Sequence, residues 1–192
     1  RRNTDLPTYN RIANHIHPAY WIICHDFDLV RWFSESEVAA VSANGSSKVS
    51  ESRARHLHVE FSMQSGVSGF IESSWRLDSE CSQFSHSDFR MISGDGTIEI
   101  PLNADIQFYS ASLNKATYAN DVLFEGRIVG PSATMIQHFL DSVLGETSSF
   151  VLLNVGLQSM KISVAVARSI SRGQVVYLEE IEDELASSSR LS

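Results

Sequence analysis

The stretch HIHPAYWIICHDFDLVRWF, from His15 to Phe33, constrains the fold more than any other part of this chain. Its apolar residues recur every three or four positions, which is the period of an α-helix. The stripe consists of Ile16, Tyr20, Ile23, Phe27 and Val30, and Ile22, Leu29 and Phe33 widen it. A helix that is apolar on most sides must be covered by other elements. The spacing therefore predicts a helix over residues 16–33 that packs under a second layer.

A polar and aromatic face lies on the same predicted helix. At about 100° per residue, its members share about a third of the helix circumference. They are His17, Trp21, Cys24, His25, Asp28 and Trp32. An imidazole near a carboxylate can act as a general base, with the carboxylate fixing its tautomer. Alternatively, His25 and Asp28 satisfy each other at the edge of the core, because residues three apart on a helix are neighbours. The spacing leaves both interpretations open.

The segments after this helix change to the period of β-strands. Apolar and polar residues alternate in them, which is typical of strands with one buried face. The predicted strands are 37–43, 56–63, 68–77, 105–110 and 174–178, and 87–102 is predicted as strand, turn and strand with Asp95-Gly96 as the turn. Residues 132–146 after Pro131, and residues 154–173, are predicted as helices. This order predicts an α+β domain whose open, largely antiparallel mixed β-sheet carries its helices on one face.

The other face of such a sheet must meet water or a partner. Phe70, Trp75, Phe89 and Ile98 lie in the predicted strands and suggest more apolar surface than the helices can cover. Large apolar patches commonly mark sites of association. We therefore expect a homodimer or homotetramer that forms through the open sheet face.

Length and charge set the domain boundaries. With 192 residues, of which 43% are hydrophobic, the chain is long enough for one domain with a core, expected over 1–178. The formal net charge is −8, and acids are concentrated in EEIEDEL, at 179–185. This run predicts a solvated, flexible acidic tail with a frayed end over 179–192. The chain has no basic block, which argues against a nucleic-acid partner.

Cysteine usage and hydropathy indicate a compartment. Cys24 lies in an apolar helical run and is far from Cys81, so buried free thiols and a cytoplasmic location are expected. No apolar run approaches the roughly 20 residues of a membrane span, and no leader is visible, so no membrane partner is expected. The chain opens with RRNTDLPTYN and lacks an initiating methionine, as expected of a fragment.

Two His-x-His pairs, His15/His17 and His56/His58, are the candidate ligands for zinc or copper. Residues i and i+2 share one face of a strand, a geometry that can hold a metal. A metal site needs three or four converging ligands, however, and no carboxylate or cysteine stands at a matching spacing. The glycines of SGDGTIEI join two strands, whereas a dinucleotide fingerprint joins a strand to a helix. We expect neither a metal nor a cofactor on this chain alone.

Four motifs in order give the chain a family resemblance. HPAYWIICHDFDLVRW resembles the first helix of the C-terminal domain of the Gfo/Idh/MocA oxidoreductases (the glucose-fructose oxidoreductase and inositol dehydrogenase family), which carries a similar H-D-x-D followed by R/L-W. FRMISGDGTIEI resembles the strand-turn-strand of that domain. MIQHFLDSVLGE and VGLQSMKISVAVARSISRGQVVYL resemble its two closing helices and its final strand. The resemblance covers nearly the whole chain.

This resemblance implies an NAD(P)-dependent oxidoreductase built from two domains. In the family an N-terminal Rossmann domain binds NAD or NADP, and the C-terminal domain supplies the substrate wall and the oligomer interface. The Rossmann glycines and the lysine of the family's E-K-P motif have no counterpart here, so the N-terminal domain is expected to be absent from this chain. Residues 1–178 would then be the substrate-binding and oligomerisation domain for a sugar, polyol or related hydroxy compound, inactive alone.

The resemblance also implies roles for the polar face. His25 matches the histidine that, in inositol dehydrogenase-like members, assists removal of the substrate's hydroxyl proton while hydride passes to the nicotinamide. His25 is therefore the candidate catalytic residue, and Trp21, His17 and Asp28 are the candidate substrate-binding residues. Trp21 stands where those members carry an aspartate, and an indole cannot take a proton but can stack on a sugar face. The alternative function is a non-catalytic, homo-oligomeric binding or assembly module.

Overall fold

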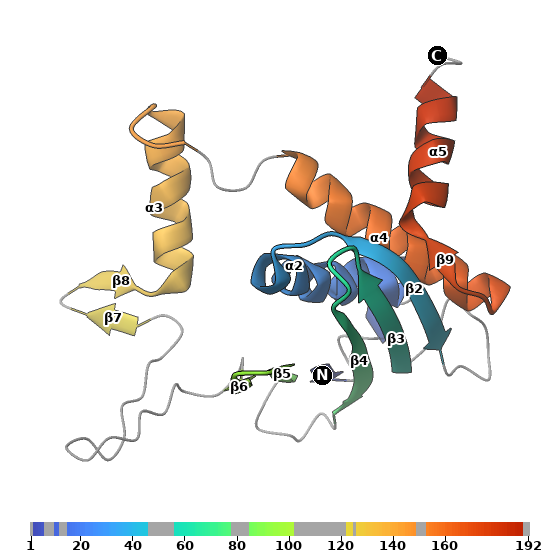
Figure 1. The fold of residues 1–192 in the computed structure, drawn as a ribbon. Helices are drawn as coiled ribbons and strands as arrows, with labels where there is room; N and C mark the ends of the chain where they lie inside the picture. The colour runs from blue at the N-terminus through green and yellow to red at the C-terminus, as the bar shows by residue number, and fades with distance from the viewer. Residues whose placement is uncertain are drawn as a thin grey trace. The chain divides into compact units, whose positions relative to one another are not determined.

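The computed structural model describes residues 2–5, 10–11, 15–45, 56–77, 85–101, 122–124, 126–148 and 153–189 (Figure 1). The chain forms two compact units. Unit 1 consists of residues 1–87 and 153–192, and unit 2 consists of residues 88–152. The predicted first helix and its polar face therefore lie entirely in unit 1.

A mixed β-sheet forms the centre of unit 1. Its strands are β1 (Arg2–Asp5), β2 (Val38–Gly45), β3 (His56–Met63), β4 (Ser68–Leu77), β9 (Val176–Tyr177) and the first residues of β5 (Ser85–Ser93). They are arranged in the order β5-β1-β4-β3-β2-β9. Among these described strands, β1 and β4 are parallel and the other neighbours are antiparallel. The predicted open, mixed and largely antiparallel sheet is confirmed.

Alternation along the strands gives this sheet one apolar face. The buried residues of β3 are Leu57, Val59, Phe61 and Met63, and more polar residues stand between them. Because successive side chains of a strand point to opposite faces, these four form one apolar row. In β2 the register shifts between Val38 and Ala40. This bulge keeps both Val38 and Val41 in the core, although they are an odd number of residues apart.

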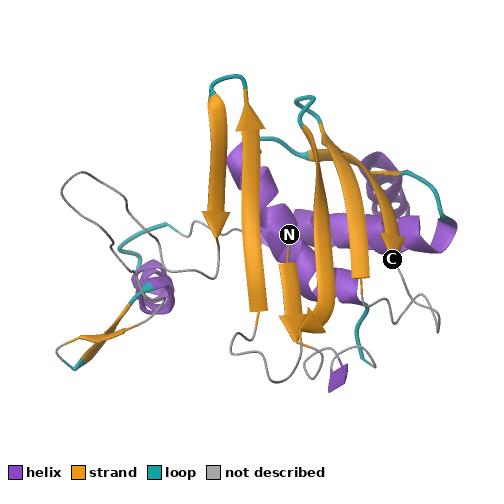
Figure 2. Cartoon of the chain, turned by 90° about the horizontal axis from the view of Figure 1, so that it is seen from below, coloured by secondary structure: helices purple, strands orange, loops and turns teal. Residues whose placement is uncertain are grey.

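Helices cover the apolar row from one side (Figure 2). The predicted first helix is a π-helical turn, η1 (Ala19–Ile23), followed by α2 (Cys24–Ser34). Ile23 and Phe27 of this helix are fully buried. The helix predicted over 154–173 is α4 (Leu153–Arg172), which packs on β2 and on α2. The predicted placement of the helices on one sheet face is confirmed.

Small residues bring α4 close to the sheet. The buried residues of α4 are Ser159, Ile162, Ser163, Ala165, Val166 and Ser169. The Ser169 hydroxyl accepts a hydrogen bond from the Ala43 amide of β2 (2.9 Å) and donates one to the Gln174 carbonyl (2.5 Å). β9 pairs only with Ala40 and Val41 of β2. Ser169 therefore satisfies a backbone amide of β2 beyond the end of β9.

The acidic segment forms a helix, α5 (Leu178–Ser189), where the sequence predicted a tail with a frayed end. Leu178 and Ile181 are buried in the core of unit 1. Ion pairs tie α5 to α4: Lys161–Glu182 (3.0 Å), Arg168–Glu184 (2.7 Å) and Arg172–Glu180 (3.2 Å). The prediction of a tail was wrong because it weighed the acids of this segment without the apolar Leu178 and Ile181 in its first turn and without the bases on the preceding helix.

The uncovered face of the central strands is mainly polar. It carries His56, His58, Glu60 and Ser62 of β3 together with Phe70 and Glu72 of β4. Phe70 is 63% exposed and stacks on His58, with 5.4 Å between ring centroids. Trp75, predicted to add to this apolar surface, is 1% exposed and lies in the core. Trp75 is an even number of residues from buried Ile71, so both side chains point to the apolar face of the sheet, whereas Phe70 points to the other face.

Unit 2 contains the remainder of β5, paired antiparallel with β6 (Gly96–Pro101), the hairpin of β7 (Val122–Phe124) and β8 (Arg127–Val129), and α3 (Pro131–Val143). The predicted strand-turn-strand and the helix after Pro131 are confirmed. The turn itself is Gly94-Asp95, one residue earlier than predicted, because Gly96 already pairs with Ser93. The predicted strand 105–110 lies outside the described residues. None of the helices described is long and apolar enough to cross a membrane.

Candidate functional site

The predicted polar face contains an exposed edge of η1 and α2. Trp21, His25, Asp28 and Trp32 follow one another at intervals of four, three and four residues, and all four are exposed. These intervals place residues on one side of a helix. Trp21 is 40% exposed and Trp32 is 72% exposed, although both are large and partly apolar. The four residues, called the Trp–His edge below, combine an imidazole and a carboxylate with an indole on either side along the helix.

A π-helical turn precedes His25 directly. Trp21 is the central residue of η1, and His25 is the second residue of α2. Isolated π-helical turns are rare and are found frequently at functional sites, where an extra residue changes the direction of the side chains. The irregular backbone of this helix therefore coincides with the Trp–His edge.

His17 and Cys24, the other members of the predicted face, are half-buried and contact the backbone. Nδ1 of His17 accepts a hydrogen bond from the Ala19 amide (3.2 Å), and its ring meets Tyr20 edge-on. His17 thus caps the start of the helix. The Cys24 thiol donates to the Tyr20 carbonyl (3.5 Å), and burial raises the pKa of this thiol.

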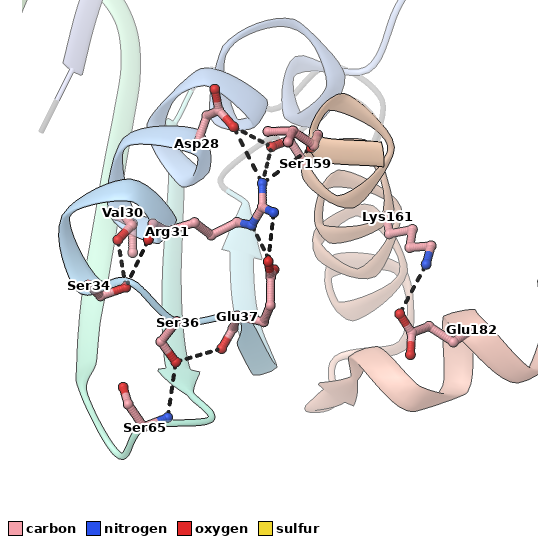
Figure 3. Close-up of polar contacts among 11 residues, drawn as sticks. Asp28, Val30, Arg31, Ser34, Ser36, Glu37, Ser65, Ser159, Lys161 and Glu182 are labelled. Carbon is pink, nitrogen blue, oxygen red and sulfur yellow. Dashed lines mark hydrogen bonds and ion pairs between the residues drawn. The ribbon is translucent and has the colours of Figure 1, made fainter. Parts of the chain in front are cut away.

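The Asp28 carboxylate is held by α4 and by Arg31 (Figure 3). Its Oδ1 accepts a hydrogen bond from Ser159 Oγ of α4 (3.1 Å) and lies 3.4 Å from Arg31 Nη1. Arg31 Nη1 also donates to Ser159 Oγ (3.2 Å) and to the Val155 carbonyl (3.3 Å). Among the hydrogen bonds of the described residues, none joins Asp28 to His25. The interpretation in which His25 and Asp28 satisfy each other is therefore wrong for this structure.

Arg31 forms a second, stronger contact with Glu37, just before β2. Its Nε and Nη2 donate to the two carboxylate oxygens of Glu37, each at 2.7 Å. Such bidentate, charge-assisted pairs are among the stronger hydrogen bonds in proteins. The Arg31 side chain is only 10% exposed. The hydrogen bond from Arg31 lowers the pKa of the Glu37 carboxyl below its ordinary value and raises that of Arg31.

Sequence reasoning missed Arg31, Glu37 and Ser159 as parts of this arrangement. The spacing of three residues between Asp28 and Arg31 on one helix was a usable signal. Ser159 is 131 positions from Asp28, and no local pattern connects residues so far apart. The structure thus assembles Asp28, Arg31, Glu37 and Ser159 into one cluster, called the Arg31 cluster below.

The described residues do not gather a metal site. Among them, no group of three or more His, Cys, Asp or Glu side chains is placed to hold a metal ion. His56 and His58 lie on the uncovered sheet face, where the nearest partner of His58 is the Phe70 ring. Gly94 and Gly96 do not form a dinucleotide fingerprint, because they lie between two antiparallel strands, whereas a pyrophosphate site needs amides at a helix N-terminus.

The fold of this chain is similar to that of part of several solved dehydrogenases. Scyllo-inositol dehydrogenase from Lactobacillus casei, solved with bound NAD(H) and scyllo-inositol, is similar with a TM-score of 0.67 and 15% identity, covering 93% of this chain and 56% of that one. Myo-inositol 2-dehydrogenase from Lactobacillus plantarum gives 0.67 and 16%, with coverages of 92% and 54%. Myo-inositol dehydrogenase from Corynebacterium glutamicum gives 0.66 and 15%, with coverages of 92% and 54%. The chain spans about half the length of these structures.

A match to a family model comes from the sequence. Residues 10–99 match the model of the GFO/IDH/MocA C-terminal domain. This segment contains the Trp–His edge and strands β2, β3 and β4. The predicted resemblance to the C-terminal domain of the Gfo/Idh/MocA oxidoreductases is confirmed. No relative was found among curated proteins.

Proposed function

We propose that this chain is the substrate-binding domain of an NAD(P)-dependent oxidoreductase that oxidises a hydroxyl group of a sugar, polyol or related compound. The observation that carries the proposal is the exposed imidazole of His25 on the Trp–His edge, within the segment that matches the family model. A neutral imidazole near a substrate hydroxyl can accept its proton as a general base.

The other residues of the edge would bind the substrate ring. Sugars and cyclic polyols carry C–H groups on their ring faces, and indoles present large, rigid apolar surfaces to such groups. Trp21 precedes His25 by about one helical turn and is exposed. Its indole would therefore stack on the substrate ring. Asp28 is engaged by Arg31 and Ser159 and would contact the substrate through its remaining carboxylate oxygen.

The nicotinamide cofactor would be held outside this chain, whose only candidate glycine turn, at Gly94–Gly96 among the described residues, joins two strands instead of a strand and a helix. A separate nucleotide-binding domain of the same protein would supply it, as the half-length coverage of the solved dehydrogenases supports. The chain alone would then be inactive. When bound, the cofactor would accept the hydride from the substrate.

His25→Asn in the full-length protein is the test of this proposal. Asparagine keeps a similar shape but cannot accept a proton at neutral pH, so kcat for NAD(P)-dependent oxidation of inositols or sugars should fall by about 10²- to 10⁴-fold. His15→Asn, at an exposed histidine outside the edge, is the matched control and should keep the activity. Full activity of the His25→Asn protein would overturn the assignment.

A second candidate function is homo-oligomeric assembly through the uncovered sheet face, with or without catalysis. The observation that favours it is the stacked pair of Phe70 and His58 amid His56, Glu60 and Glu72. A face that carries both imidazoles and carboxylates can be complementary to a second copy across a two-fold axis.

Light scattering at micromolar concentration tests this assembly. We expect a dimer or tetramer that Phe70→Asp converts to monomers, because the charge would be buried in the interface. Val67→Asp, at an exposed residue of the β3–β4 turn, is the control and should leave the oligomer intact. A clean monomer of the unsubstituted protein would refute the sheet-face interface.

A further inference from the structure

We propose that Arg31 is a positioning residue that keeps the Asp28 carboxylate away from His25, so that the imidazole stays available to the substrate. This inference rests on the proposed function and adds a residue that neither the sequence patterns nor the family match assigns. Arg31 is mostly buried next to the Trp–His edge and would not touch the substrate. Its role would be to fix the position of the Asp28 side chain.

Arg31 is anchored by Glu37 and by the Val155 carbonyl. Glu37 binds its Nε and Nη2 at 2.7 Å each, and the Val155 carbonyl accepts from its Nη1 at 3.3 Å. The guanidinium is planar and rigid, so a fork fixed by Glu37 leaves Nη1 in a defined place. That place is next to Ser159 Oγ and Asp28 Oδ1. The arginine thus presents a charge and a donor to Asp28 from the side of α4.

Asp28 has an alternative partner on its own helix. His25 is three residues earlier and on the same exposed edge, and side chains at this spacing can form an ion pair or hydrogen bond. A carboxylate beside an imidazole stabilises the protonated ring, so a paired His25 would become able to accept a substrate proton only at a higher pH than an unpaired one. In the structure Asp28 instead bonds with Ser159 and Arg31. The contacts of the Arg31 cluster would therefore determine whether Asp28 pairs with His25.

Few other charges compete for this role. Among the described residues, the titratable and charged groups of α2 besides His25 are Cys24, Asp26, Asp28 and Arg31. Those of η1 and α4, which pack against α2, are Tyr20, Lys161, Arg168 and Arg172, and Glu37 precedes β2. Lys161 is paired with Glu182 of α5, and Glu37 is occupied by Arg31. Among the described residues, Arg31 is the one cation bonded to Asp28.

The test is the pH dependence of kcat/KM for Arg31→Met in the full-length enzyme. Freed from Arg31, Asp28 should pair with His25 and move the acidic midpoint of the profile up by about one pH unit. Below that midpoint kcat/KM should fall about tenfold. Adding Asp28→Asn to Arg31→Met should restore the original midpoint, because no carboxylate then remains to pair with His25. A purely structural role of Arg31 predicts no such rescue.

Two further variants keep the test decisive if Arg31→Met folds poorly. Ser159→Ala removes one hydrogen bond from Asp28 without touching Glu37, and should shift the midpoint in the same direction by a smaller amount. Arg168→Met removes the other bidentate arginine, which binds Glu184 on α5, and should leave the midpoint unchanged.

The outcomes separate this inference from the proposed function. Loss of activity in His25→Asn with unshifted profiles in both Arg31→Met and Ser159→Ala would overturn the role of Arg31 alone. Full activity in His25→Asn would overturn the proposed function and this inference together. A shifted midpoint that Asp28→Asn reverses is the result we expect.

Discussion

Individual polar residues join the layers of unit 1 at points where the regular backbone hydrogen bonds end. Ser169 bonds with the Ala43 amide of β2 and the Gln174 carbonyl, and its side chain is fully buried. Arg31 likewise joins α2 to Glu37 before β2 and to α4. Because buried polar groups are costly without partners, each of these side chains fixes the position of the helix that carries it.

Ser169→Ala should destabilise the protein by about 1–3 kcal/mol, because the Ala43 amide would be buried without its partner. Chemical denaturation measures the change directly. Ser187→Ala is the matched control, since its hydroxyl bonds with the Asp183 carbonyl on the exposed face of α5. Equal stabilities of the two variants would contradict the bridging role of Ser169.

The Arg31–Glu37 pair predicts a stability loss in acid. Arg31 holds the pKa of Glu37 below its ordinary value of 4.5. The unfolded chain therefore binds a proton more readily at this residue, so the contribution of Glu37 is present above about pH 4.5 and is lost as the pH falls through the lowered, folded-state pKa. Chemical denaturation at pH 6 and at pH 3.5 gives the loss in free energy of unfolding between the two pH values. This loss should be smaller for Glu37→Gln than for the unsubstituted protein. Glu60→Gln, on the open sheet face, should keep the full difference.

For single residues, the sequence predicted which side chains share one face of a helix. It did not predict their hydrogen-bond partners on other elements. His25 and Asp28 were placed on one face because the helical period fixes that geometry. The contact of Asp28 with Ser159 depends on how α4 crosses α2, which no local pattern contains. The predicted catalytic role of His25 is tested by His25→Asn, and the roles of Trp21, His17 and Asp28 in substrate binding stay predictions.

At the scale of elements, β3 and β4 pack against α2 through one glycine and two phenylalanines. Phe61 of β3 pairs with Gly69 of β4, and its ring lies over the glycine. The same ring meets Phe27 of α2 edge-on, with 5.5 Å between centroids. Gly69 thus makes room for a core aromatic between the sheet and the helix that carries His25.

Gly69→Ala should therefore destabilise the protein by about 1–3 kcal/mol through overpacking. A Cβ atom at this position would lie 2.7 Å from Phe61 Cζ, and Phe27 restricts the movement of the ring. Gly156→Ala in α4 is the opposite control, because nothing lies within 4 Å of its Cβ position and alanine favours helix by up to about 1 kcal/mol. Thermal unfolding should lower Tm for the first variant and raise it for the second.

Predictions of helices and strands succeeded where the hydrophobic residues follow a single helical or strand period. They failed where a second feature, such as a run of charges, competes with that period. The alternation in 56–63 and the helical stripe in 154–173 gave β3 and α4 nearly at their observed bounds. Trp75 was misplaced because apolar strand residues were added together without separating the two faces. The acidic run was misread because ion pairs with another helix outweigh its charge, and the π-helical turn η1 has no sequence signature of its own.

At the scale of the whole molecule, we propose that the chain forms one side of an active site. It provides a general base candidate, His25, and two exposed indoles, Trp21 and Trp32. The glycines of the β5–β6 turn join two strands, unlike a dinucleotide fingerprint, and the chain spans about half of the solved dehydrogenases that share its fold. The central claim is that substrate chemistry lies in this domain and nucleotide binding in another.

Calorimetric titration of NADH into the purified 192-residue chain tests this claim most directly, because it requires no knowledge of the substrate. We predict no saturable heat for NADH or NADPH up to about 1 mM, a concentration that would detect interactions of roughly −4 kcal/mol. A second titration into the full-length protein should give saturable binding. Micromolar binding of NADH to the isolated chain would contradict the account.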